Sequence, residues 1–113
     1  FRESLLLKYG KCVITGVDIS QVLVASHMTP WAACDNRERL DVNNGLILSA
    51  TYDRLFDSGL ISFNEHGNLL ISKFVSNANR ALLSLDSKRA YSIGYSISMR
   101  EYLQYHNEVI YLK

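Results

Sequence analysis

The 113-residue sequence has few cysteines and no long apolar run, and each shortage excludes a class of protein. Its two cysteines, Cys12 and Cys34, form no C-x-x-C pair, so a four-ligand structural zinc site would need at least two further ligands. Two lone thiols fit a reducing cytoplasm, and a single disulfide between them is the alternative. No apolar run approaches the length of about 20 residues that a membrane span needs. We therefore expect a cytoplasmic protein, without a membrane segment, that depends on its hydrophobic core.

The sequence also lacks a charge excess, because twelve Lys and Arg residues face eleven Asp and Glu residues, for a net charge of +1. Charge alone therefore gives no indication of a nucleic-acid partner, although a local basic patch is compatible with this total. Repeats and low-complexity segments are absent, so residues 1–113 are predicted to form one domain. Because Phe1 is not an initiator residue, we expect a processed chain or a domain excised from a longer one.

Hydrophobic periodicity and turn residues predict an α+β domain. The pattern indicates a short helix that ends at Gly10, a β-type run over 12–16, a strand by 22–26, a long loop over 28–44 and a strand over 45–49. It then indicates a helix capped by Ser49, a hairpin over 60–72, helix-compatible residues over 73–89, a strand or loop over 90–99, and a closing helix capped at Ser98. Loops as long as 28–44 are often functional.

Three polar residues mark the junctions of a β-loop-β-helix unit in the middle of the chain. His27 ends the first strand, Asn44 opens the second, and Asp53 follows nine positions later in the helix. Taken singly, each has an ordinary structural interpretation: a strand-end histidine, a turn asparagine and a solvated carboxylate. Only their order and spacing favour a shared chemical role.

The segments "VASHMTPWA", "NNGLILSATYD" and "LFDSGLISF" resemble, in order and spacing, the HNH endonucleases of bacterial restriction and phage defence. This resemblance implies a ββα-metal core over about residues 12–63 with flanking helices and a β-hairpin. It also implies metal-dependent hydrolysis of DNA phosphodiester bonds. His27 would be the general base, Asn44 would brace the loop, and Asp53 would hold the metal where the family often has histidine.

The chemistry of these residue types suits those roles. Imidazole titrates near neutral pH, so a histidine can take a proton from water. Carboxylate oxygen is a good ligand for Mg²⁺, which we expect as the cofactor, with Mn²⁺, Ni²⁺ or Zn²⁺ as alternatives. One departure is Ser26, a weak ligand at a position where many family members carry Asp or His. Asp57, on the same helix face as Asp53, is a further candidate ligand, or else an ion-pair or capping residue.

The remaining expectations concern partners. Arg54, Arg37 and Arg39 are candidates for contact with DNA phosphates. None of them indicates base reading, so a fused specificity or sensor domain is expected, and cutting both strands would favour a homodimer. The alternative to an enzyme is a degenerate HNH domain that binds DNA or protein without cutting. Trp31 is expected to pack on the core and His66 to be an exposed bystander.

Overall fold

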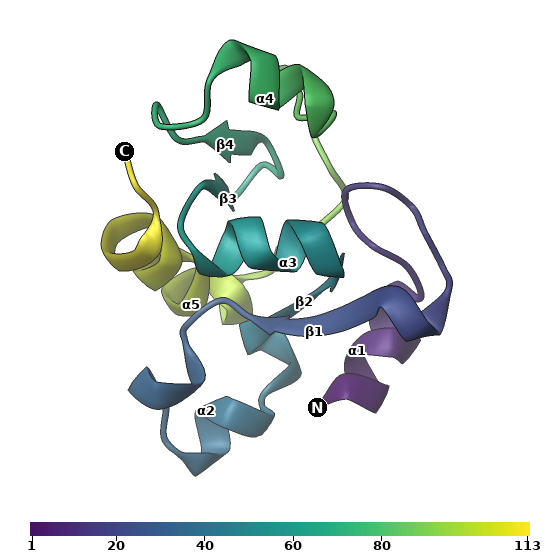
Figure 1. Cartoon of the computed structure of the whole chain (residues 1–113). Coiled ribbons are helices and arrows are strands. Elements are labelled where there is room, and N and C mark those ends of the chain that lie inside the picture. Colours follow the sequence, from purple (N-terminus) through teal and green to yellow (C-terminus); the bar gives the residue numbers. More distant parts are fainter.

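A two-stranded antiparallel sheet with a helix packed across it forms the centre of the computed structural model, which describes residues 1–113. Strands β1 (Leu23–His27) and β2 (Gly45–Ser49) pair so that His27 lies opposite Gly45. Helix α3 (Ala50–Asp57) follows β2 directly and packs against both strands (Figure 1). The predicted ββα unit and the α+β class are therefore confirmed.

Helix α1 (Arg2–Tyr9) covers the sheet near the start of β2. Its buried Leu5 belongs to the core, and the helix ends at Gly10, whose φ of 69° is left-handed as a glycine C-cap allows. The contact with the sheet is very close at Gly45. A Cβ atom there would lie 2.5 Å from Leu5 Cδ1 and 2.6 Å from Phe1 Cζ. Glycine at position 45 therefore leaves room for the Leu5 and Phe1 side chains beside β2.

Helix α3 is covered on its other side by the C-terminal half of the chain. The hairpin of β3 (Ile61–Phe63) and β4 (Leu69–Ile71) lies there, with α4 (Asn77–Leu82) beyond it (Figure 1). Helix α5 (Arg100–Tyr105) continues into a π-helical turn, His106–Ile110. No helix is both long and apolar enough to cross a membrane. The core thus has α3 at its centre, between the sheet that carries His27 and the elements of the C-terminal half.

The sequence-based expectations were wrong in two segments before the second strand. Residues 12–16 form a turn closed by Gly16 N–H donating to the Cys12 carbonyl, not a strand. The expected loop over 28–44 contains helix α2 (Asn36–Leu40) between two 3₁₀ turns. A capping box begins α2: the Asp35 side chain accepts from Glu38 N–H at 2.8 Å, and the Glu38 side chain accepts from Asp35 N–H at 2.9 Å.

Of the two predicted serine caps, Ser49 is confirmed in its position and Ser98 is wrong. Ser49 stands at the N-cap of α3 but makes no side-chain capping bond. Ser98 lies inside a 3₁₀ turn, Ile97–Met99, and α5 begins only at Arg100. Within 73–89 only α4 is helical, and 90–99 contains no strand, apart from a single bridge between Asn68 and Ala90.

Candidate active site

A pocket of about 380 Å³ opens where β1 ends beside the first turns of α3. Its lining comes from β1, the segment after it and α3: Val24, Ala25, Ser26, His27, Pro30, Trp31, Asp53 and Asp57. The structure therefore gathers the candidate base and all three candidate metal ligands around one cavity. Asn44 does not line the pocket; it holds the loop behind His27, as described below.

His27 is held in one orientation at the pocket wall. Its Nε2 lies 2.9 Å from the carbonyl oxygen of Arg39. A carbonyl can only accept, so Nε2 carries the proton and Nδ1 is the nitrogen with a lone pair. Nδ1 has no hydrogen-bond partner in the protein. The ring also stacks on Phe1, with centroids 4.1 Å apart and planes 8° from parallel. The half-buried imidazole is thus oriented through Nε2 and the ring face that stacks on Phe1, while Nδ1 has no protein partner.

Asn44 ties the segment after β1 to the loop that supplies the Arg39 carbonyl. The Asn44 carbonyl accepts from Met28 N–H at 2.9 Å, and its Oδ1 accepts from Thr29 N–H at 2.9 Å. Its Nδ2 lies 3.2 Å from the carbonyl oxygen of Glu38, one residue before Arg39. Asn44 is completely buried, so these bonds are shielded from water. It therefore fixes both ends of the loop that holds the His27 ring.

Asp41 holds the turn that presents Asn44. Its Oδ1 accepts from Asn43 N–H at 3.0 Å, and its Oδ2 accepts from the Tyr102 hydroxyl of α5 at 2.8 Å. Burial alone would raise the pKa of Asp41, but these hydrogen bonds and the charge of Arg37 outweigh it, so the pKa lies below its usual value. The carboxylate therefore stays ionised and keeps accepting both bonds.

Ser26 and Asp53 are joined across the pocket, since the Ser26 hydroxyl donates to Asp53 Oδ1 at 2.5 Å. This bond links the end of β1 to the first turn of α3, and Ser26 is only 2% exposed. Asp57 lies one turn further along α3 and is exposed. Partial loss of solvation raises the pKa of Asp57, and the negative charge of Asp53 adds to this, while Arg54 and His27 oppose it. The two carboxylates thus influence each other electrostatically.

The donor set of this pocket suits a hard cation that is also held by substrate. Asp53 and Asp57 supply carboxylate oxygens and Ser26 a hydroxyl, and nowhere in the chain do three His, Cys, Asp or Glu side chains form a cluster able to hold a metal. Mg²⁺ is commonly bound by one or two carboxylates together with water and substrate phosphate. Zn²⁺ usually requires three or four protein ligands. The residues present therefore fit a hard divalent cation that shares its coordination with water and substrate.

The segment that builds this pocket matches a known family. A sequence profile described as HNH endonuclease matches residues 12–64, which include both strands, α3 and every residue that lines the pocket. Over these residues the chain is similar to the HNH endonucleases. This similarity supports nuclease activity at a coarse level. No curated protein matches the chain.

The arginines of the HNH segment occupy three different places. Arg54 is exposed on α3, next to Asp53. Arg39 lies at the pocket rim, where its Nε donates to the Trp31 carbonyl at 3.0 Å. Arg37 is remote from the pocket and pairs loosely with Asp41, 3.9 Å away. Of the three predicted phosphate contacts, the structure places Arg54 and Arg39 beside the HNH site.

Trp31 does not pack on the core as expected, because 59% of its surface is exposed. The Arg39 guanidinium lies 3.7 Å from the centre of its ring and holds it at the pocket rim. Sequence reasoning also missed Phe1, Asp41 and Tyr102, which support the site from outside the three signature positions. The Asp35-x-x-Glu38 capping-box pattern could have predicted the start of helix α2, which carries Arg39.

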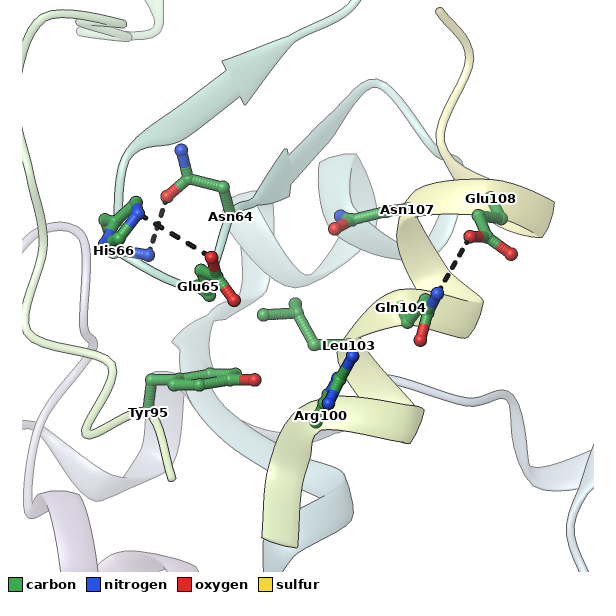
Figure 2. Close-up of a pocket in the computed structure, with 9 residues that line it drawn as sticks. All are labelled: Asn64, Glu65, His66, Tyr95, Arg100, Leu103, Gln104, Asn107 and Glu108. Carbon is green, nitrogen blue, oxygen red and sulfur yellow. Dashed lines mark hydrogen bonds and ion pairs between the residues drawn. The ribbon is translucent and has the colours of Figure 1, made fainter. Parts of the chain in front are cut away.

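A second polar pocket lies on the C-terminal side, outside the HNH site (Figure 2). The hairpin turn contributes Asn64, Glu65 and His66, and α5 with its π-helical turn contributes residues that include Arg100 and Glu108. His66 is exposed there as expected, and its only side-chain partner is Glu65, 3.7 Å away. With no orienting carbonyl for its ring, His66 lacks the fixed geometry of His27.

Proposed function

We propose that this HNH domain is a divalent-metal-dependent DNA endonuclease that hydrolyses phosphodiester bonds. The observation that carries the proposal is the convergence of an oriented, half-open His27 and the Ser26–Asp53 pair on one pocket. A base and a set of metal ligands around one cavity are what hydrolysis of a phosphodiester requires.

In this mechanism His27 Nδ1 takes a proton from a water molecule, and the resulting hydroxide attacks phosphorus as the bond to the leaving oxygen breaks. The Arg39 carbonyl keeps Nε2 protonated and stabilises the imidazolium that forms. Asp53, with Ser26 and Asp57 as further ligand positions, would hold the cation. When bound, the cation stabilises the added negative charge on the phosphate and on the leaving oxygen. Asn44 positions the loop, and Arg54 and Arg39 contact the DNA backbone.

The test is incubation of supercoiled plasmid with the protein and Mg²⁺, Mn²⁺ or Ni²⁺. We expect nicking that His27→Ala reduces by about 10²- to 10⁴-fold, the usual contribution of a general base. The matched control is His66→Ala, which removes an exposed histidine outside the pocket and should leave the rate unchanged. Equal activity of wild type and His27→Ala would exclude the base role.

The biological setting follows from the resemblance of the motifs to the restriction and defence branch, and we propose a role there. A single site cuts one strand, so double-strand cleavage would use a homodimer. None of the arginines indicates base reading, which favours a fused specificity or sensor domain. Both cysteines are free thiols, in keeping with a reducing cytoplasm.

One observation favours the second candidate, a degenerate HNH module that binds DNA or protein without cutting. The short Ser26–Asp53 hydrogen bond occupies a carboxylate oxygen that the cation would need. Calorimetric titration with Mg²⁺ or Mn²⁺ separates the two candidates. Micromolar binding that Asp53→Ala abolishes supports the enzyme, whereas no binding even with DNA present supports the module.

A further inference from the structure

Trp31 is an exposed aromatic ring at the wall of the candidate active site. It begins a 3₁₀ turn, Trp31–Ala33, directly after Pro30, and it lines the same pocket as His27 and Asp53. Its surface is 59% exposed. A large apolar ring held in water at a ligand pocket is unfavourable by itself, which makes it a candidate contact for whatever enters that pocket.

The ring is also rigidly presented. The Arg39 guanidinium lies 3.7 Å from the ring centroid, donates from Nε to the Trp31 carbonyl at 3.0 Å, and donates from Nη1 to Asn36 Oδ1 at 3.2 Å. These bonds use two of the five N–H groups of Arg39 and place its positive charge against the indole. A fixed indole loses little conformational entropy when a ligand stacks on it.

We propose that Trp31 is a stacking platform for a nucleobase next to the phosphate that is cleaved. This inference rests on the proposed nuclease function and adds the class of substrate. A base can stack on an indole only when it has left its own stack, so the preferred substrate has a single-stranded or unpaired nucleotide at the cleavage point. The pocket, at about 380 Å³, falls within the size range of small-molecule sites.

The neighbouring charges agree with this placement. Arg39 holds its guanidinium beside the ring, where it can attract the phosphate that adjoins a stacked base. Aromatic stacking together with a cation on the backbone is the usual way in which proteins bind single strands. Stacking is tolerant of sequence, so this contact by itself would not select a cleavage sequence.

The first experiment uses the fluorescence of Trp31, the single tryptophan of the chain. The His27→Ala protein with Mg²⁺ is titrated with a single-stranded oligonucleotide, the same length of abasic strand, and a continuous duplex. We expect strong quenching by the single strand and much weaker quenching by the other two. Equal quenching by the abasic strand would overturn the proposal, because that strand offers only phosphates and sugars.

Anisotropy of a labelled oligonucleotide, measured in the same samples, distinguishes failure of the stacking role of Trp31 from failure of the proposed nuclease function. Binding without quenching would overturn the stacking role and leave the proposed nuclease intact. No binding of any oligonucleotide would overturn both. The quenching measurement does not depend on cleavage, so a weakly active enzyme still gives a decisive result.

The second experiment compares variants in single-strand affinity. Trp31→Ala should weaken binding roughly 5- to 150-fold, the range for loss of one stacked base, and Trp31→Phe should keep most of the affinity. The matched control is Phe74→Ala. Phe74 is 68% exposed and has a cation over its ring, Lys73 Nζ at 5.5 Å, but it does not line the pocket.

Both alanine variants remove exposed rings, so thermal unfolding should show that each still folds. Unchanged affinity of Trp31→Ala, or an equal loss in Phe74→Ala, would contradict the assignment of Trp31.

Discussion

His27 and His106 lie in different parts of the molecule, but each is held by the same two contacts, a phenylalanine ring and a backbone carbonyl. Each ring stacks nearly parallel on a phenylalanine: His27 on Phe1 at 4.1 Å, and His106 on Phe56 at 3.7 Å. In each, Nε2 lies within 3 Å of a backbone carbonyl, that of Arg39 or of Phe56. The two carbonyls select the same tautomer, with the proton on Nε2.

The difference between the two rings lies at Nδ1. In His106 this nitrogen is 2.7 Å from the Ser62 hydroxyl, which itself accepts from Asn107 Nδ2 at 2.7 Å and so donates to the ring. His106 is 1% exposed, and burial lowers its pKa to about 4. In His27, a residue that lines the candidate active-site pocket, the same nitrogen has no partner in the protein. The same set of contacts therefore satisfies every polar atom of the His106 ring and leaves one acceptor of the His27 ring free, as the proposed base role requires.

The largest expected effect is on the free energy of unfolding, which should differ strongly between alanine variants of the two histidines. His106→Ala should lower the free energy of unfolding by about 3 to 5 kcal/mol, because it leaves a cavity beside Phe56 and removes the partner of Ser62. His27→Ala should cost less than about 1 kcal/mol, since the half-buried ring leaves little void. Urea unfolding at pH 7 measures both. Equal losses would mean that His27 is also a structural residue.

The next effect concerns Asn44, which holds the loop behind His27. Asn44→Asp replaces the Nδ2 donor with an oxygen that faces the Glu38 carbonyl, so a buried unpaired charge results. We expect a loss of about 2 to 3 kcal/mol in unfolding free energy, together with reduced nicking of plasmid. Asn36→Asp is the matched control, because Asn36 is exposed and the retained Oδ1 still accepts from Arg39. A similar loss of unfolding free energy in both variants would contradict the role of Asn44 in holding the loop.

The third effect is a pH dependence that originates at His106. Its pKa in the folded state is about 4, below the ordinary value of 6.5, so the unfolded chain binds more protons between these values. Stability is therefore complete above about pH 6.5 and falls as the pH drops toward 4, by about 2 kcal/mol between pH 7 and pH 5. His106→Gln should abolish this slope, whereas His66→Gln should retain it. A slope that survives His106→Gln would place its origin in other groups.

Local patterns were sufficient to predict the ββα core. The strands at 22–26 and 45–49, the helix after Ser49 and the hairpin over 60–72 have clear periodicity and turn residues, and all four are present. The resemblance of the motifs to the HNH endonucleases then assigned His27, Asn44 and Asp53 to one site. His27 and Asp53 do line one pocket, and Asn44 lies behind it.

Contacts between distant segments could not be predicted in this way. The carbonyl that orients His27 comes from Arg39, twelve residues away, and the ring that stacks on it comes from Phe1. Trp31 was expected inside because large apolar rings usually are, but its guanidinium partner holds it at the surface. Periodicity also left the burial of His106 open, because burial is decided by tertiary packing.

The smallest predicted effect tests whether the two histidine regions are independent, because one helix serves both. Tyr102 on α5 donates to Asp41 on the His27 side, and one turn later His106 packs against Phe56. Tyr102→Phe should cost about 1 kcal/mol in unfolding free energy and reduce nicking modestly, by loosening the turn that carries Asn44. Tyr105→Phe is the control, since the Tyr105 hydroxyl has no partner in the protein.

The acid slope between pH 7 and pH 5 should be the same in Tyr102→Phe as in wild type. The double variant with His106→Gln should show additive losses within about 0.5 kcal/mol, as expected for sites that share no partner. A changed slope or a larger coupling would show that α5 transmits the ionisation of His106 to the loop that holds His27. The two regions would then form one cooperative unit.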